Sequence, residues 1–166
     1  MDPLERESGV SRAEAFQLDR VNLYERLGEE PFRALVTTFY ERVYADPDAW
    51  FRSIFAGRPK EASIQNLQEW LVQRVGGPKL YTKRKGSPGL IGRHMQFSVT
   101  SAAAERWLEH MEAALLEQQD AIDYSSRQML SCFFHHTAWF IKRGLESMRN
   151  ERKLSTQTGP PGKSRS

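Results

Sequence analysis

The sequence contains a single cysteine, Cys132, so it cannot form an intrachain disulfide. No apolar run approaches the roughly 18 residues of a membrane-spanning helix, and residues 1–16 alternate acids and bases where a secretory signal needs a continuous apolar stretch. These absences predict a cytoplasmic protein without a membrane anchor. With 39% hydrophobic residues in 166, we expect one domain with one substantial core, in which Cys132 is a small buried residue and not a reactive thiol.

Charge is unevenly placed along the chain. The net charge is +3, and residues 151–166 alone account for that excess, so residues 1–150 are formally neutral. Within this neutral body, residues 70–104 contain no acid and six bases: Arg74, Lys79, Lys83, Arg84, Lys85 and Arg93. Such a local excess favours a nearby anion, whether phosphate, a polynucleotide or a carboxylate-bearing cofactor. A solvated basic loop would explain it equally well.

Apolar residues recur at helical spacing along most of the chain, and strand patterns are almost absent. The spacing predicts helices over residues 22–28, 31–44, 49–55, 59–75, 100–119 and 125–148, with a turn or two over 89–94. Asn22 and Gly28 suit the two ends of the first helix, and Pro31 suits the first turn of the second. Ser125 and Gln128 have the spacing of a capping box. The first dozen residues and those after about 150 have the composition of disordered ends, and the predicted fold class is all-α.

The loop GGPKLYTKRKGSPGLIGRH, residues 76–94, ends on one histidine among apolar residues. An axial ligand of haem iron needs a neutral imidazole nitrogen aimed at the metal, a partner for the other nitrogen, and an apolar pocket. Leu90 and Ile91 lie one turn before His94 and Phe97 one turn after it, and the basic loop could reach two propionate carboxylates. Spacing alone leaves a second interpretation open, in which His94 is a hydrogen-bonded structural residue.

Other aromatic and imidazole side chains also have ordinary interpretations. Tyr40 and Trp107 lie on apolar helix faces, where such residues usually belong to the core and have one satisfied polar atom. His135 and His136 project about a hundred degrees apart on a helix, so they cannot share a metal as an i, i+4 pair can. We expect this pair and His110 to be partly buried or surface residues.

Several motifs together resemble the truncated haemoglobins, specifically the plant-type members of their second group. These motifs are TFYERVYADPDAWFRSIF, QNLQEWLVQRVGGPKLY, RKGSPGLIGRHMQF and AAERWLEHM, which occur in the family's order within residues 20–150. The resemblance implies a 2-on-2 helical sandwich over residues 20–150 that holds haem b. It leaves residues 1–19 as a short N-terminal helical extension and residues 151–166 as a disordered basic tail.

The resemblance also implies roles for single residues. It makes His94 the proximal iron ligand, and it makes Tyr40 and Trp107 the distal residues that donate hydrogen bonds to a ligand on the iron. Three further positions would face the haem: Phe55 against the porphyrin, Ser63 where vertebrate globins carry the distal histidine, and Leu67 where many relatives carry glutamine. The other cofactor-binding candidates are Tyr81, Lys83, Lys85 and Arg93 for the propionates, and Leu90 and Phe97 for the apolar wall. Gln96 departs from the proline that relatives often have there.

A haem in such a pocket implies reversible binding of O₂, CO and NO at a five-coordinate iron. Two hydrogen-bond donors in a dry site would slow O₂ release, which suits oxygen or NO redox chemistry or sensing better than delivery. Turnover resembling an NO dioxygenase or a peroxidase would need electrons from a separate reductase, because no Gly-x-Gly-x-x-Gly motif is visible. Whether the chain is an enzyme, and whether it is a monomer or a homodimer, stays open.

Two other classes of function compete with haem binding. One is a helical nucleic-acid-binding module that uses the basic loop and tail, and the other is a helical interaction protein without a cofactor. Against the first, the basic residues alternate with glycine and proline and do not line one helix face. The haem interpretation therefore expects neither nucleic acid nor membrane as a partner, and a Soret band in purified protein separates the three.

Overall fold

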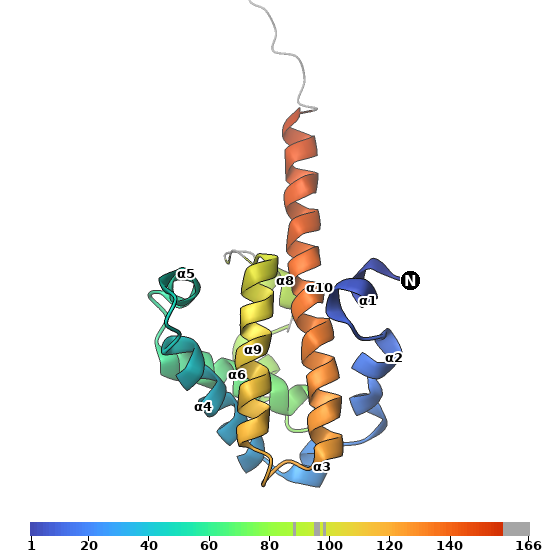
Figure 1. Cartoon of the computed structure of the whole chain (residues 1–166), viewed down its shortest axis with the longest axis vertical. Coiled ribbons are helices and arrows are strands. Elements are labelled where there is room, and N and C mark those ends of the chain that lie inside the picture. Colours follow the sequence, from blue (N-terminus) through green and yellow to red (C-terminus); the bar gives the residue numbers. More distant parts are fainter. Residues whose placement is uncertain (88, 95–96, 98, 158–166) are drawn as a thin grey trace, which may run out of the picture.

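The structure is a computed structural model that describes residues 1–87, 89–94, 97 and 99–157, and within them the chain is helical, with no strand (Figure 1). The predicted all-α class is confirmed. The elements are α1 (Pro3–Ser8), α2 (Arg12–Ala15), η1 (Gln17–Arg20), α3 (Leu23–Leu27), α4 (Glu30–Tyr44), α5 (Ala49–Arg52), η2 (Ser53–Phe55), α6 (Lys60–Arg74), α7 (Leu80–Lys85), α8 (Leu90–Arg93), α9 (Ser101–Glu117) and α10 (Tyr124–Gln157).

Two helix pairs form the body of the fold. Helix α4 packs against α6 and α9, and α9 packs against α10, so the two pairs enclose a common core. The apolar stripe predicted for residues 31–44 is buried at Phe32, Leu35, Val36, Phe39 and Val43. Tyr40, on the same stripe, is only half-buried because it borders a cavity. This arrangement is the expected 2-on-2 sandwich.

Local signals place several helix ends where the sequence predicted them. The Asn22 side chain accepts a hydrogen bond from the Glu25 N–H at 2.9 Å, and α3 ends at Gly28 with a positive φ of 77°. Helix α10 differs, because Asp123 and not Ser125 caps its start. The Asp123 carboxylate accepts from the N–H of Ser126 at 3.1 Å and from its hydroxyl at 2.6 Å.

The N-terminal extension is ordered on the body, so the expectation that the first dozen residues are disordered was wrong. Helices α1 and α2 both pack against α10. A capping box between Ser11 and Glu14 starts α2, and the Glu7 carboxylate pairs with Arg143 and with Lys142, the latter at 3.2 Å. These ion pairs join positions far apart in the sequence and hold the extension in place.

Helix α10 continues beyond the other helices, and its last part projects from the body (Figure 1). Residues 151–157, assigned to the tail from composition, are helical and exposed. Residues 158–166 lie outside the described part of the chain. Among the helices that are described, none combines the length and the apolarity needed to cross a membrane.

Candidate functional site

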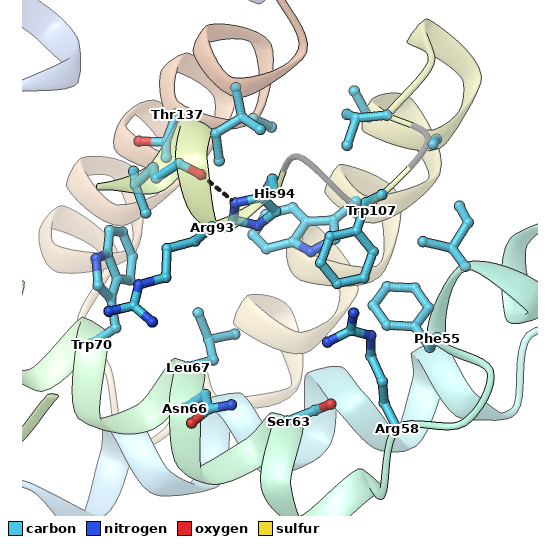
Figure 2. Close-up of a pocket in the computed structure, with 18 of the residues that line it drawn as sticks. Phe55, Arg58, Ser63, Asn66, Leu67, Trp70, Arg93, His94, Trp107 and Thr137 are labelled. Carbon is cyan, nitrogen blue, oxygen red and sulfur yellow. Dashed lines mark hydrogen bonds between the residues drawn. The ribbon is translucent and has the colours of Figure 1, made fainter. Parts of the chain in front are cut away.

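A cavity of about 320 Å³ lies between α6 and the segment that carries His94, and it brings nearly all the predicted site residues together. Eleven of them line it: Tyr40, Phe55, Ser63, Leu67, Tyr81, Lys85, Leu90, Arg93, His94, Phe97 and Trp107. Figure 2 shows His94 on one side of the cavity and Ser63 and Leu67 of α6 on the opposite side. Lys83 alone among the predicted residues does not line it, and Gln96 lies outside the described residues.

His94 ends the short helix α8, and its imidazole is oriented by the backbone. Its Nδ1 lies 2.7 Å from the carbonyl oxygen of Leu90, one turn earlier, as the dashed line in Figure 2 marks. Because a carbonyl can only accept, this contact places the proton on Nδ1 and leaves the Nε2 lone pair available. Among the described residues, no group bonds to Nε2.

The surroundings of His94 favour its neutral form. Burial lowers the pKa of the imidazole, the hydrogen bond to Leu90 opposes this shift, and the nearby Arg58 cation lowers the pKa further. A neutral imidazole is the form that binds a metal.

Helix α8 is seated on α10 through a close contact at a glycine. A Cβ added at Gly144 of α10 would lie only 2.3 Å from Cδ1 and 2.7 Å from Cγ1 of Ile91. Ile91 thus occupies the space that any larger residue at 144 would fill. This contact sets the position of α8, and with it the position of His94 three residues later.

The two predicted hydrogen-bond donors border the cavity with their polar atoms unused. Among the described residues, neither the Tyr40 hydroxyl nor the Trp107 indole N–H has a hydrogen-bond partner. Both rings pack edge-on against Phe39, at centroid distances of 4.9 and 4.8 Å. Burial raises the pKa of Tyr40 above its usual value, so its hydroxyl keeps its proton and can donate.

The predicted wall residues Phe55, Leu67 and Ser63 make the cavity largely apolar around Tyr40 and α6. The ring centroid of Phe55 lies 6.4 Å from that of Tyr40 and 5.5 Å from that of Phe51. Leu67 contributes only apolar surface. The Ser63 hydroxyl lies 2.9 Å from the Tyr44 hydroxyl, which itself donates to the backbone carbonyl of Arg58 at 2.9 Å. Ser63 is therefore already engaged by Tyr44.

The basic residues of the 76–94 loop divide between the cavity and the outer surface. Tyr81 is buried in the cavity wall, with the Arg93 guanidinium 5.4 Å from its ring centroid, and Lys85 follows one turn later on the same face of α7. Arg93 donates to the backbone carbonyls of Lys85 and Ser87, the latter at 3.0 Å, which ties the loop to α8. Lys83 is exposed instead, because two residues along a helix turn a side chain to the other face.

Sequence reasoning missed one cation inside the cavity, Arg58. Its guanidinium extends into the cavity (Figure 2) and stacks on the ring of Phe97, 4.1 Å from the centroid. It pairs with no carboxylate among the described residues. In the sequence, the only signal for Arg58 is that a basic residue directly precedes Pro59, where a helix is predicted to begin. Trp70, Asn66 and Thr137, also unpredicted, line the same cavity (Figure 2).

A buried carboxylate fixes α9, which carries Trp107, against the start of α5. Asp46 is 1% exposed and accepts from Arg106 Nη1 at 2.8 and 2.9 Å, from the Asp48 N–H at 2.8 Å, and lies 2.6 Å from His110 Nε2. Burial by itself would raise the pKa of Asp46, but these hydrogen bonds outweigh it and lower the pKa to about 2. Asp46 therefore stays ionised, and His110 serves this network and not the cavity.

The donor set fits a haem. The cavity supplies one neutral imidazole with a free Nε2, mostly apolar walls, and cations from Arg58, Arg93 and Lys85 that could meet carboxylates. Its volume is in the range of sites for small molecules and cofactors. The polar atoms of Tyr40 and Trp107 border the same cavity without a described protein partner, so they are available to a molecule bound there.

Comparisons with known proteins agree with this assignment. Residues 22–139 match the family model of the bacterial-like globins. The chain is 52% identical to two-on-two hemoglobin-3 of Arabidopsis thaliana over 88% of this chain and 83% of that protein. It is 48% identical to group 2 truncated hemoglobin 3-1 of Lotus japonicus over 92% and 90%. The crystal structure of the hemoglobin from Chloroflexus aurantiacus superimposes with a TM-score of 0.66 at 35% identity and covers 73% of this chain and 97% of that one.

The family match begins at the cap of α3 and runs through α4, α6 and α9 into the first half of α10. The resemblance to the plant-type second group of truncated haemoglobins is thereby confirmed. Haem as a cofactor and the binding of gaseous ligands follow from the family. The chain belongs to the bacterial-like globins, as a truncated haemoglobin of the second group.

Proposed function

We propose that this chain binds haem b through His94 and reversibly binds O₂, CO and NO, with Tyr40 and Trp107 as hydrogen-bond donors to the ligand. The observation that carries the proposal is the set of three polar atoms bordering one apolar cavity without described protein partners. These are His94 Nε2, the Tyr40 hydroxyl and the Trp107 indole N–H.

His94 acts as the axial ligand in this proposal. Donation from its Nδ1 to Leu90 fixes the tautomer and the plane of the ring, and raises the basicity of Nε2. A haem held there would supply the iron to which a diatomic molecule binds. Tyr40 and Trp107 would act on that ligand, and Arg58 and Arg93 on the haem propionates.

Tyr40 and Trp107 select among ligands by charge. A bound haem would give O₂ a partial negative charge and would leave CO far less polar. Donors in a dry site stabilise the charged ligand more strongly. Slow O₂ release is the consequence, which suits oxygen or NO redox chemistry or sensing.

Two of the cations that line the cavity would hold the propionates. Arg58 and Arg93 lie on different segments, before α6 and at the end of α8, so together they can meet two carboxylates. Each guanidinium also stacks on an aromatic ring, Phe97 for Arg58 and Tyr81 for Arg93. Arg58→Met should therefore speed haem transfer to apomyoglobin severalfold, and an unchanged transfer rate would remove Arg58 from this role.

The test of the distal donors compares two ligands in matched variants. Each hydrogen bond to the charged ligand is worth about 1.5 to 3 kcal/mol, so Tyr40→Phe and Trp107→Phe should each accelerate O₂ release by about one to two orders of magnitude. CO release should change much less. Tyr44→Phe is the control, because the Tyr44 hydroxyl bonds to Ser63 and to the backbone of Arg58 and does not border the cavity.

Stopped-flow measurement separates the alternatives. Equal acceleration of O₂ and CO release in either variant would mean that access has changed, and the hydrogen-bonding role would be withdrawn. The double variant is measured as well, since two donors to one ligand are not additive.

A further inference from the structure

The short helix α7 presents two different faces. Tyr81 and Lys85, four residues apart, turn toward the haem cavity and line it. Lys79 and Lys83 lie two residues from Tyr81 on either side of it, so they have the spacing of the opposite face, and Leu80 lies beside that face. We call these three residues the α7 outer face.

The α7 outer face combines unpaired positive charge with exposed apolar surface. Lys79 and Lys83 are exposed, and neither pairs with a carboxylate among the described residues. The neighbouring Arg84 is not part of this face, because it pairs with Glu69 at 2.8 Å and with Asn66 at 2.7 Å on α6. Leu80, beside the two lysines, is 39% exposed. Unpaired cations next to an exposed apolar side chain form a surface suited to a protein of opposite charge.

This face also lies close to the haem cavity. A helix with its side chains is about 10 to 12 Å across, and the far side of α7 is the cavity wall. A redox group docked on the α7 outer face would therefore be separated from the cavity by one helix, with the aromatic ring of Tyr81 between them.

From this arrangement we infer that the α7 outer face is the docking surface for a small acidic one-electron carrier protein that reduces the haem. The inference rests on the proposed function, because a ferric globin must regain one electron before it binds O₂ again. The carrier loses one electron and ferric iron becomes ferrous, with no bond made or broken. The chain carries no flavin or nicotinamide motif, so the electron comes from another protein.

The small number of cations and the exposed leucine favour a protein over a nucleic acid. The face has only two cations, whereas a polyanion gains affinity from each phosphate that is neutralised. Exposed Leu80 would contribute to a protein interface and nothing to phosphate contacts.

The test reverses charge on this face in the full-length haem-loaded protein. Lys79→Glu/Lys83→Glu is compared with Arg152→Glu/Lys153→Glu on the exposed, projecting end of α10, which makes the same change in net charge. The probe is flavodoxin, an acidic carrier. The dissociation constant is measured with oxidised flavodoxin, and the rate of haem reduction with the reduced form. A small uncharged quinol serves as the reference reductant.

We expect the α7 variant to weaken flavodoxin binding and slow its reduction of haem by at least about tenfold at low salt, with an unchanged quinol rate. The α10 variant should retain most of the flavodoxin affinity and most of the rate of haem reduction by flavodoxin. Equal losses in the two variants, or no loss in either, would overturn the inference. Tighter binding to an oligonucleotide, lost in the α7 variant alone, would reassign the face to nucleic acid. If the protein binds no haem, the proposed function fails and the Soret band is absent. Binding of oxidised flavodoxin can still be measured in that case, so the two failures are distinguishable.

Discussion

Replacing Gly144 by alanine tests how α10 positions the iron ligand. The added methyl would lie 2.3 Å from Ile91 Cδ1, whereas carbon atoms pack best at about 3.8 Å, so Ile91 must withdraw by about 1.5 Å. Overpacking of this kind costs about 1 to 3 kcal/mol. Alanine is also the better helix former by about 1 kcal/mol, which acts in the opposite direction. We expect the free energy of unfolding to fall by up to about 2 kcal/mol, because the overpacking outweighs the gain in helix propensity. Helix propensity alone would raise it by about 1 kcal/mol.

The same displacement should reach the haem. Ile91 belongs to α8, which ends at His94, so moving Ile91 tilts the imidazole away from its present direction. Haem transfer to apomyoglobin should accelerate severalfold in Gly144→Ala. Urea unfolding and haem transfer are measured together, so that stability and ligand geometry are read separately.

Two variants control this experiment. Gly92→Ala makes the same substitution within α8, where an added Cβ meets nothing within 4 Å, so it should be neutral or stabilising. Ile91→Ala gives room to the new methyl, so adding Gly144→Ala to it should not accelerate haem transfer further. If Gly144→Ala behaves like Gly92→Ala in both measurements, the contact does not position α8.

Two further predictions concern Asp46 and the chain ends. The pKa of Asp46 is lowered from 3.8 to about 2, so its contribution to folding stability is complete above about pH 4 and is lost as the pH falls toward 2. Asp46→Asn should cost about 3 kcal/mol of stability at pH 7 and reduce the loss of stability between pH 4 and pH 2, measured by urea titration. An unchanged loss over this pH range would refute the assignment. Truncation after Asn150 should leave haem binding and the unfolding midpoint unchanged, because residues 151–157 are exposed and project from the body. Deleting residues 1–19 should lower the midpoint, because α1 and α2 pack against α10. Calorimetry that finds the reverse order would mean that the tail and not the extension supports the body.

Sequence predicts best what local chemistry decides. The cap at Asn22 and the apolar stripe of α4 depend on residues within one or two turns, and the structure has both. At α10, Asp123 and Ser125 are both good capping residues two positions apart, and the pattern could not choose between them. The extension was misjudged because its composition resembles a disordered end, while Glu7 is held by partners more than a hundred residues away.

The site shows the same division. His94, Tyr40 and Trp107 came from motifs with a fixed order, and the structure places all three beside one cavity. Arg58 was missed because its direction depends on Phe97, a partner brought near only by the fold. Lys83 was grouped with the cavity by charge, although the register of α7 turns it outward. Charge in a loop indicates a class of ligand, and only the helix register shows which side chains face it.

The most direct measurement of the central claim is the ferrous deoxy absorption and resonance Raman spectrum of His94→Gly, with and without added imidazole. We predict that the spectrum of a five-coordinate imidazole-ligated haem is lost in this variant and restored by imidazole, which can enter the space left by the side chain. His110→Gly serves as the control and should retain the wild-type axial-ligand spectrum, because His110 bonds to Asp46 outside the cavity. An unchanged iron–histidine band in His94→Gly would show that another residue holds the iron.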